Sequence, residues 1–100
     1  MEEFLQSGYD IDGMMYYSFE QIGAFLYPEK CSCDATNKIR KIYLYRRKDL
    51  EQYTTKTKCW WSNQTIVVIN QEGLKKLCGF IKKSDCNEKV SKLKFCINFS

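Results

Sequence analysis

The sequence predicts an α+β domain: a small antiparallel sheet of two hairpins with three to four helices packed on it. Three observations support this class. Asp12-Gly13 is a strong hairpin signal near the N-terminus. The run TIVVI, residues 65–69, is the most strand-like segment of the chain. Apolar residues recur with helical spacing in stretches that begin near residues 19, 35, 71 and 88. In chain order these signals predict β-β-α-α-β-β-α-α.

The chain of 100 residues is expected to form one domain, residues 1–100, because this length leaves no room for a second core. Its hydrophobic share of 44% is ordinary for a folded protein, and no linker or repeat interrupts it. No apolar run is long enough to cross a bilayer, so we expect no membrane association. The N-terminus has two glutamates and no apolar stretch typical of a signal peptide. We therefore expect an intracellular protein.

The first hairpin is predicted within residues 3–19, with two short strands around Asp12-Gly13, because Gly13 accepts positive φ and Asp12 tolerates it. Ser18 ends the second strand and opens a helix over about 19–27. Gln21, three residues later, completes a capping box, and Pro28 ends the helix.

Gly23 lies inside the helix predicted over 19–27, where glycine costs about 1 kcal/mol relative to alanine. We therefore expect another element to pack closely there. A second helix is predicted over about 35–45, with Asp34 as its N-cap. Its expected buried stripe consists of Ala35, Ile39 and Ile42.

The second half of the chain begins with a hairpin over residues 56–70, in which the TIVVI run is expected to be a central strand. Asn70 is the expected N-cap of a helix over about 71–83, and a last helix is expected over about 88–98. The periodic apolar residues of all these elements should form one core: Phe19, Ile22, Leu26, Ile39, Ile42, Val67, Ile69, Leu74, Leu77 and Leu93.

Charge is distributed very unevenly along the chain. Residues 1–29 contain six acidic residues and no lysine or arginine, so all 16 basic residues follow Pro28. The basic residues are densest from Lys30 to Lys58, where they alternate with tyrosines. A basic stretch with interleaved aromatics is typical of a polyanion partner, most often nucleic acid. The alternative is a solvated lysine-rich surface with no partner.

The basic side of the helix at 35–45, its continuation to residue 48 and one arm of the second hairpin form the predicted DNA site. Lysine and arginine bind phosphates, whereas arginine and asparagine pair with base edges, which favours Arg40 and Asn37 as base readers. The alternative for Arg40 is a salt bridge to Asp49 or Glu51. The predicted DNA-binding residues are Asn37, Lys38, Arg40, Lys41, Tyr45, Arg46, Arg47, Lys48, Lys56 and Lys58.

Trp60 and Trp61 are expected within the second hairpin, where neighbouring side chains point to opposite faces. One tryptophan should then be buried and the other more exposed. An exposed tryptophan could stack on an unpaired base or anchor a protein partner. The alternative is that both serve only the core.

The six cysteines are expected to be free and structural, because a reducing compartment disfavours disulfides. The alternatives are disulfides or a zinc site that includes Cys31 and Cys33, although one intervening residue is not the usual ligand spacing. We expect no cofactor and no metal. We also expect no enzymatic activity, because the chain has no histidine, no phosphate-binding glycine loop and no nucleophile beside a base.

Four stretches resemble the Bro-N family, the N-terminal domain of viral and phage Bro proteins. They are YSFEQIGAFLY at 17–27, NKIRKI at 37–42, VVINQEGLKKL at 67–77 and KVSKLKFCI at 89–97. The third is the most specific. Gln21 stands where the family usually has aspartate, and Gly23 where it has alanine. The chain ends three residues after the last stretch, so we expect a stand-alone short form.

This resemblance implies binding to duplex DNA with low sequence specificity, and a part in regulating viral or host transcription or replication. A viral protein of this kind would act in the host nucleus or cytoplasm. The alternative is a protein-protein interaction module that binds a host or viral partner or pairs with longer Bro proteins. An acidic lobe beside a basic one would also favour a homodimer.

Overall fold

The computed structural model describes the backbone of residues 2–98 and confirms the α+β class. The strands are β1 (Tyr9–Ile11), β2 (Met14–Ser18), β3 (Thr54–Lys58) and β4 (Thr65–Asn70). The helices are α1 (Glu2–Gln6), α2 (Phe19–Leu26), α3 (Ser32–Tyr45), α4 (Arg47–Leu50), α5 (Gln71–Gly79) and α6 (Glu88–Asn98). Short 3-10 turns at Glu51–Tyr53 and Lys83–Asp85 complete the chain.

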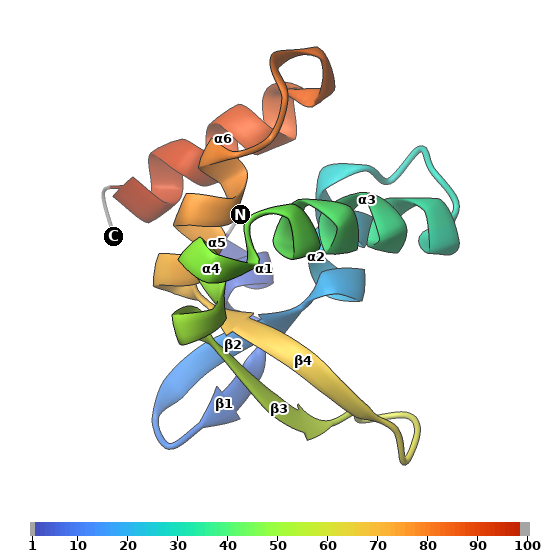
Figure 1. Cartoon of the computed structure of the whole chain (residues 1–100), viewed down its shortest axis with the longest axis vertical. Coiled ribbons are helices and arrows are strands. Elements are labelled where there is room, and N and C mark those ends of the chain that lie inside the picture. Colours follow the sequence, from blue (N-terminus) through green and yellow to red (C-terminus); the bar gives the residue numbers. More distant parts are fainter. Residues whose placement is uncertain (1, 99–100) are drawn as a thin grey trace.

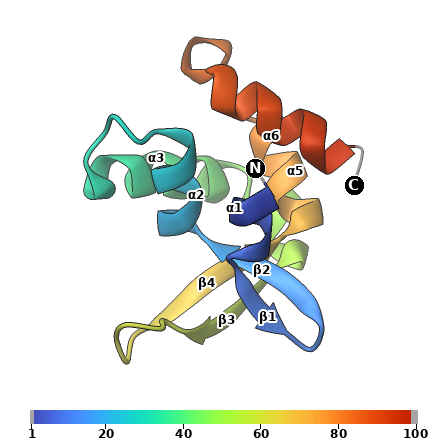
Figure 2. The same ribbon diagram turned by 180° about the vertical axis from the view of Figure 1, so that it is seen from behind.

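The four strands form one antiparallel sheet in the order β1-β2-β4-β3. β4 is an inner strand, as predicted, since it pairs with β2 through Tyr17–Ile69 and with β3 through Lys56–Val67. The helices gather at one end of the sheet, and both hairpins project away from them (Figure 1). The view from behind shows the same arrangement, with α6 farthest from the hairpins (Figure 2).

One core joins the sheet to the helices. Eight of the ten predicted core residues are buried, and the other two, Ile42 and Val67, are half-buried against the same cluster. Further aromatic and aliphatic side chains complete it, among them Phe4, Tyr17, Tyr27, Tyr43, Leu50, Ile81 and Val90. The Cα radius of gyration, 12.6 Å, is the value expected for one domain of this length.

Local hydrogen bonds explain where the predicted elements begin. Asp12 and Gly13 have φ angles of 53° and 83°, the conformation that the hairpin turn requires. The capping box at the start of α2 is complete: the Ser18 hydroxyl accepts from the Gln21 N–H, and the Ser18 N–H donates to Gln21 Oε1, both at 3.0 Å. Asn70 caps α5 by accepting from the Gly73 N–H at 2.9 Å.

Two glycines permit close approach between elements. A Cβ at Gly23 would lie 2.7 Å from the Ala35 carbonyl carbon, which confirms the predicted close packing of α2 on α3. A Cβ at Gly73 would lie 2.4 Å from Ile69 Cγ1 and 2.5 Å from Tyr53 Cβ. The residues of the VVINQEGLKKL stretch therefore join β4 to α5 and to the turn before β3.

The predicted first strand is present as β1, but the prediction missed the short helix α1 that precedes it, so the strand begins only at Tyr9. Phe4 decides this, because its ring stacks on Phe25 at 4.4 Å and on Tyr17 at 5.2 Å. The Tyr17 hydroxyl also donates to the Leu5 carbonyl. These partners are distant in sequence, so the local strand and turn pattern could not reveal them.

Three further boundaries differ from the prediction. α3 begins at Ser32 with Cys31 as its N-cap, so Asp34 lies in the first turn and supports the helix through its charge. A separate helix, α4, follows at Arg47–Leu50 because buried Leu50 turns the chain back toward the core. α5 ends at Gly79, not near residue 83.

Candidate nucleic-acid interface

The outer face of α3 carries Asn37, Arg40 and Lys41, all exposed. They lie opposite Ala35, Ile39 and Tyr43, which the helical repeat turns into the core. Arg40 Nη1 donates to Asn37 Oδ1 at 3.0 Å, so the two predicted base readers are neighbours. Among residues 2–98 Lys41 has no ion-pair partner within 4 Å. This face therefore offers unneutralised positive charge beside a planar hydrogen-bonding pair.

Lys38 does not share this outer face, contrary to the prediction. Its Nζ lies 2.7 Å from Asp85 Oδ1 and 5.4 Å from the centre of the Tyr27 ring, and its side chain is only 25% exposed. The Tyr27 hydroxyl donates to the Asp85 carbonyl at 3.0 Å. Burial, reinforced by the charge of Asp85, raises the pKa of Tyr27 to about 12. Lys38 thus helps to hold α3 against the segment before α6.

Arg46, Arg47 and Lys48 continue the positive charge beyond α3. The Arg46 guanidinium lies 4.8 Å from the centre of the Phe80 ring, which fixes its stem against α5. Arg47 Nη2 is 3.9 Å from Glu51 Oε1, a long and exposed contact that neutralises little charge. The hydrogen-bond partner of Arg40 is Asn37, so the structure does not form the alternative Arg40 salt bridge to Asp49 or Glu51.

A shallow groove of about 470 Å³ lies where α3 meets α4, lined by Leu44, Tyr45, Arg46, Arg47, Lys48, Asp49 and Glu51. Tyr45, a predicted DNA contact, is 90% exposed, and Leu44 is 57% exposed. Leu44 is not among the predicted contacts, although its position on α3, two residues beyond Ile42 and outside the buried stripe, indicates that it is exposed.

Lys56 and Lys58 are exposed on β3. Figure 1 shows that the chain runs along α3, turns at α4 and returns along β3, so that α3 and β3 diverge from this corner. Arg46 to Lys48 therefore lie at the end of α3, whereas the β3 lysines lie on the other arm. The structure divides the predicted site into two surfaces.

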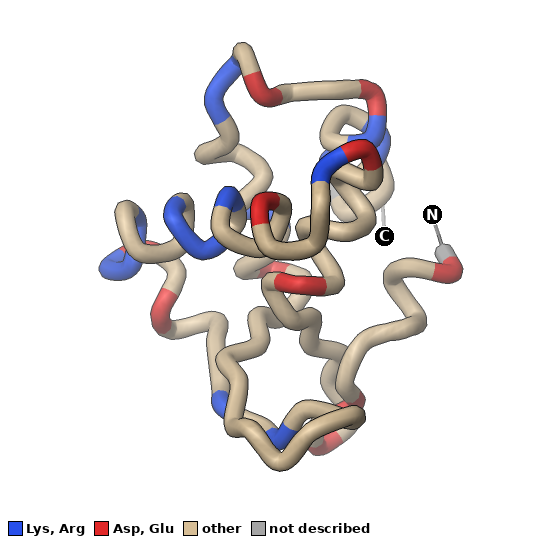
Figure 3. The backbone as a smooth tube through the Cα atoms, turned by 90° about the vertical axis from the view of Figure 1, so that its right-hand side faces the viewer, with Lys and Arg blue, Asp and Glu red and all other residues tan. Residues whose placement is uncertain are grey.

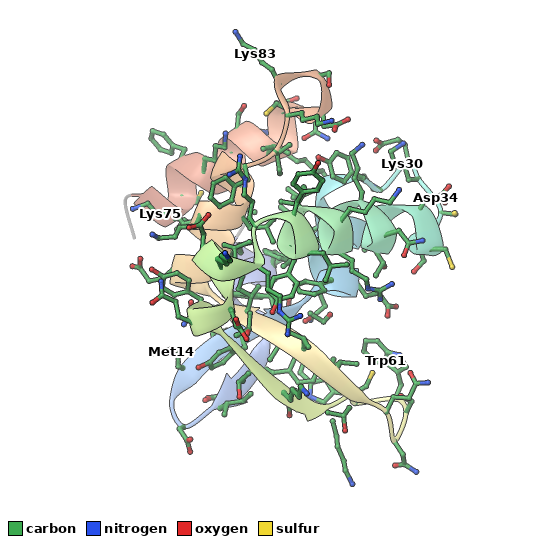
Figure 4. The ribbon with its side chains drawn as sticks, viewed as in Figure 1. Met14, Lys30, Asp34, Trp61, Lys75 and Lys83 are labelled. Atoms are coloured by element: carbon green, nitrogen blue, oxygen red, sulfur yellow. The ribbon has the colours of Figure 1, made fainter. Side chains whose placement is uncertain are left out.

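Basic residues outside this region are spread around the helical layer. Figure 3 shows Lys and Arg positions both along the helices in the upper half of the tube and in the hairpin half. In Figure 4, Lys30, Lys75 and Lys83 point away from one another, from three sides of the molecule. The outer face of α3 and the Arg46 to Lys48 segment that follows it hold the basic residues that are densest along the chain.

Both tryptophans lie in the turn between β3 and β4, and both are exposed, Trp60 by 59% and Trp61 by 60%. The expectation of one buried and one exposed tryptophan within a strand was therefore wrong, because β3 ends at Lys58. The Trp60 ring stacks on Tyr9 of β1 at 3.9 Å, and this contact buries Tyr9. Figure 4 shows Trp61 at the outer end of this hairpin.

Cys59 precedes the tryptophans and is buried beside Tyr9. Burial by itself would raise the pKa of the Cys59 thiol. Hydrogen bonding from the Trp61 backbone and from the side chains of Tyr9 and Ser62 outweighs this effect, so the pKa of Cys59 lies below its usual value. The Tyr9 hydroxyl is near both the Trp60 backbone and the Cys59 thiol. This contact links the hairpin turn to β1.

The remaining cysteines are dispersed as free thiols. Cys31 and Cys33 are exposed at the start of α3, whereas Cys78 is buried in α5, where burial raises its pKa to about 12. Within residues 2–98 no group of three or more Cys, Asp, Glu or His side chains is placed to hold a metal ion.

No helix in the described part of the chain has the length and apolar character needed to cross a membrane. No protein-family model, curated protein or solved structure matches the chain.

Proposed function

We propose that this domain is a DNA-binding protein of Bro-N type, which contacts duplex DNA through the outer face of α3 and the basic corner that follows it. Asn37 and Arg40 would reach base edges, and Lys41, Arg46, Arg47 and Lys48 would contact phosphates. A part in regulating viral or host transcription or replication belongs to the same proposal. Lys38 is left out of the contact set because Asp85 already holds it.

One observation carries the proposal: the Arg40–Asn37 pair shares the outer face of α3 with exposed Lys41, and the exposed cations Arg46, Arg47 and Lys48 follow directly in the chain. The tyrosine at the end of α3, Tyr45, adds an exposed aromatic ring. The resemblance of the four short stretches points to the same function. Those stretches also place Asn70 and Gly73 at the β4–α5 junction, where they serve the fold.

Paired charge removals test the proposal on a labelled duplex of about 20 base pairs. Replacing both Arg46 and Arg47 by alanine should weaken binding to all sequences alike, because phosphate contacts carry no sequence information. The matched control replaces Lys82 and Lys83, which removes the same charge from the exposed segment after α5. If both variants lost the same amount of DNA affinity, the interaction would depend only on net charge and not on the α3 site. If neither lost affinity, the DNA interface would be rejected.

Arg40→Ala tests base reading separately. If Arg40 pairs with guanine, the variant should lose about 1–3 kcal/mol of binding free energy on a selected preferred site and much less on random DNA. An equal loss on both would make Arg40 a phosphate contact.

A protein-interaction module is the second candidate, and the groove beside Leu44 and Tyr45 favours it. Exposed aromatic and aliphatic side chains next to arginine are typical of protein contact sites. An acidic partner segment would fit that composition. Two results together would support this candidate over DNA binding. The protein would be retained on DNA-cellulose no more strongly than on a cation exchanger, and it would elute as a dimer from a sizing column.

A further inference from the structure

The turn that joins β3 to β4, residues 59–64, is ordered by its own hydrogen bonds. The Cys59 N–H donates to the Gln64 carbonyl at 3.0 Å and closes the turn. Inside it, the Gln64 N–H donates to the Ser62 hydroxyl at 3.3 Å. A turn held this way presents its side chains in a fixed arrangement, so a ligand would lose little free energy in ordering them.

Three aromatic rings form a continuous series at this turn. Tyr9 is buried and supports Trp60 in a stacked pair, with ring centres 3.9 Å apart and an interplanar angle of 20°. Trp61 meets Trp60 at 63°, with ring centres 6.3 Å apart. The two tryptophans are almost equally exposed, but Tyr9 stacks on a face of Trp60, whereas Trp61 meets Trp60 only at an angle and is the last ring of the series.

The charge around the turn selects the kind of partner. Lys56 and Lys58 are exposed on the strand that leads into it, and no acidic residue occurs between Glu51 and Glu72. Lys58 lies two residues before Trp60, about 7 Å along an extended chain. The charge of Glu20 acts at the base of the turn, on Tyr9 and Cys59. Aromatic rings next to cations fit a nucleobase with its neighbouring phosphates.

We propose that the β3–β4 turn binds an unpaired nucleobase, which stacks on Trp61, while Lys56 and Lys58 contact the adjoining phosphates. Trp60 and Tyr9 support the platform. This surface is separate from α3, so it goes beyond the proposed duplex contact. The unpaired base can come from a single strand or from a bulge in a duplex.

Tryptophan emission tests the proposal directly, because Trp60 and Trp61 are the only tryptophans in the chain. Trp60→Phe leaves Trp61 as the reporter and keeps an aromatic ring on Tyr9, whereas Trp61→Phe leaves Trp60. Each variant would be titrated with oligo(dT), with a duplex carrying a two-thymine bulge, and with a blunt duplex of equal length. We expect oligo(dT), the bulged duplex or both to quench Trp61 more strongly than Trp60, and the blunt duplex to quench neither.

Affinity supplies the second readout. Trp61→Ala should weaken binding to the quenching probe by about 5- to 100-fold and leave blunt-duplex affinity unchanged. Phe95→Ala is the matched control, since it removes a ring of similar exposure from α6 and should change neither. Circular dichroism would confirm that each variant keeps its fold.

The outcomes separate this proposal from the α3 interface. Quenching by oligo(dT) with no blunt-duplex binding would reject the α3 interface and support the turn. Blunt-duplex binding with no difference between Trp61→Ala and the parent on any probe would overturn the turn proposal alone. If Trp61 emission in the Trp60→Phe variant shifted with protein concentration in the absence of DNA, Trp61 would be a self-association contact. That result would also overturn the turn proposal.

Discussion

Lys38 and Lys41 carry the same charge on the same helix, yet their surroundings give them different roles. Lys38 lies between Asp85 and the Tyr27 ring, whereas Lys41 faces solvent. A lysine that is already paired within the fold contributes less free energy to phosphate binding, because the existing contact must first be broken.

Lys38→Met and Lys41→Met form a matched pair of single charge removals. Lys38→Met should lower the unfolding free energy by about 0.5–1.5 kcal/mol through loss of a partly exposed ion pair and a cation–π contact. Lys41→Met should leave the unfolding free energy unchanged but weaken duplex binding. It should also make the slope of log K against log salt shallower by about 0.9, the value for one phosphate contact. Urea denaturation and salt titrations measure both. Equal effects of the two variants on DNA affinity would contradict the separation.

Two buried groups make the fold sensitive to alkali. Burial raises the pKa of Cys78 from 9.0 to about 12 and that of Tyr27 from 10.0 to about 12. The unfolded chain releases these protons first, so the stability that they contribute is complete below about pH 9 and is lost as pH rises toward 12.

Urea denaturation between about pH 8 and pH 10.5 should therefore show the unfolding free energy falling by about 1–3 kcal/mol. Cys78→Ala should be less stable at neutral pH, because it removes buried volume, but should show a smaller fall with pH. An unchanged fall in that variant would assign the alkaline sensitivity to other groups.

At the scale of elements, replacing a helical glycine by alanine should change the unfolding free energy in opposite directions at two positions. Gly23 in α2 faces the Ala35 carbonyl of α3, whereas a Cβ on Gly79 at the end of α5 would have no atom within 4 Å. Gly23→Ala should cost about 1–3 kcal/mol of unfolding free energy, since overpacking outweighs the gain in helix propensity.

Gly79→Ala should be neutral or stabilise by up to about 1 kcal/mol through the unfolded state. Thermal and urea unfolding of the two variants measure the difference. If Gly23→Ala were as stable as the parent, α2 and α3 would not be in the tight contact that orients the outer face of α3.

Strand β4 supplies a further test of the element arrangement, because its two ends differ in burial. Ile69 is fully buried between the sheet and α5, whereas Ile66 is only half-buried near the hairpin end. Ile69→Ala should cost about 2–5 kcal/mol and Ile66→Ala less than half as much. A loss under about 1 kcal/mol for Ile69→Ala would show that β4 does not join the two halves of the core.

At the scale of the whole molecule, a formal net charge of +4 conceals an acidic first segment and a basic remainder. If DNA contact neutralises about four to six phosphates, log K should fall with log salt at a slope of roughly −4 to −5. Titrations from about 50 to 200 mM salt measure the slope. A slope near −1 would mean that the outer face of α3 and Arg46 to Lys48 do not lie along the DNA backbone.

The fold class, both hairpin pairings and the starts of α2, α5 and α6 follow from local signals. Asp12-Gly13 defines one turn, Ser18 with Gln21 caps α2, and Asn70 caps α5. Each of these contacts joins residues within three positions of one another, which is the range over which a pattern in the sequence is informative. The periodic apolar residues predict the core for the same reason.

Only the tertiary structure decided the features that depend on distant partners. Phe4 is helical because its ring meets Tyr17 and Phe25, and Lys38 leaves the predicted DNA surface because Asp85 lies beside it. Trp60 stays exposed at the turn while Tyr9 is buried beneath it. The sequence by itself determined which residues could be buried, charged or capping. Long-range packing chose the partner of each, because contacts between distant segments leave no periodic trace in either segment alone.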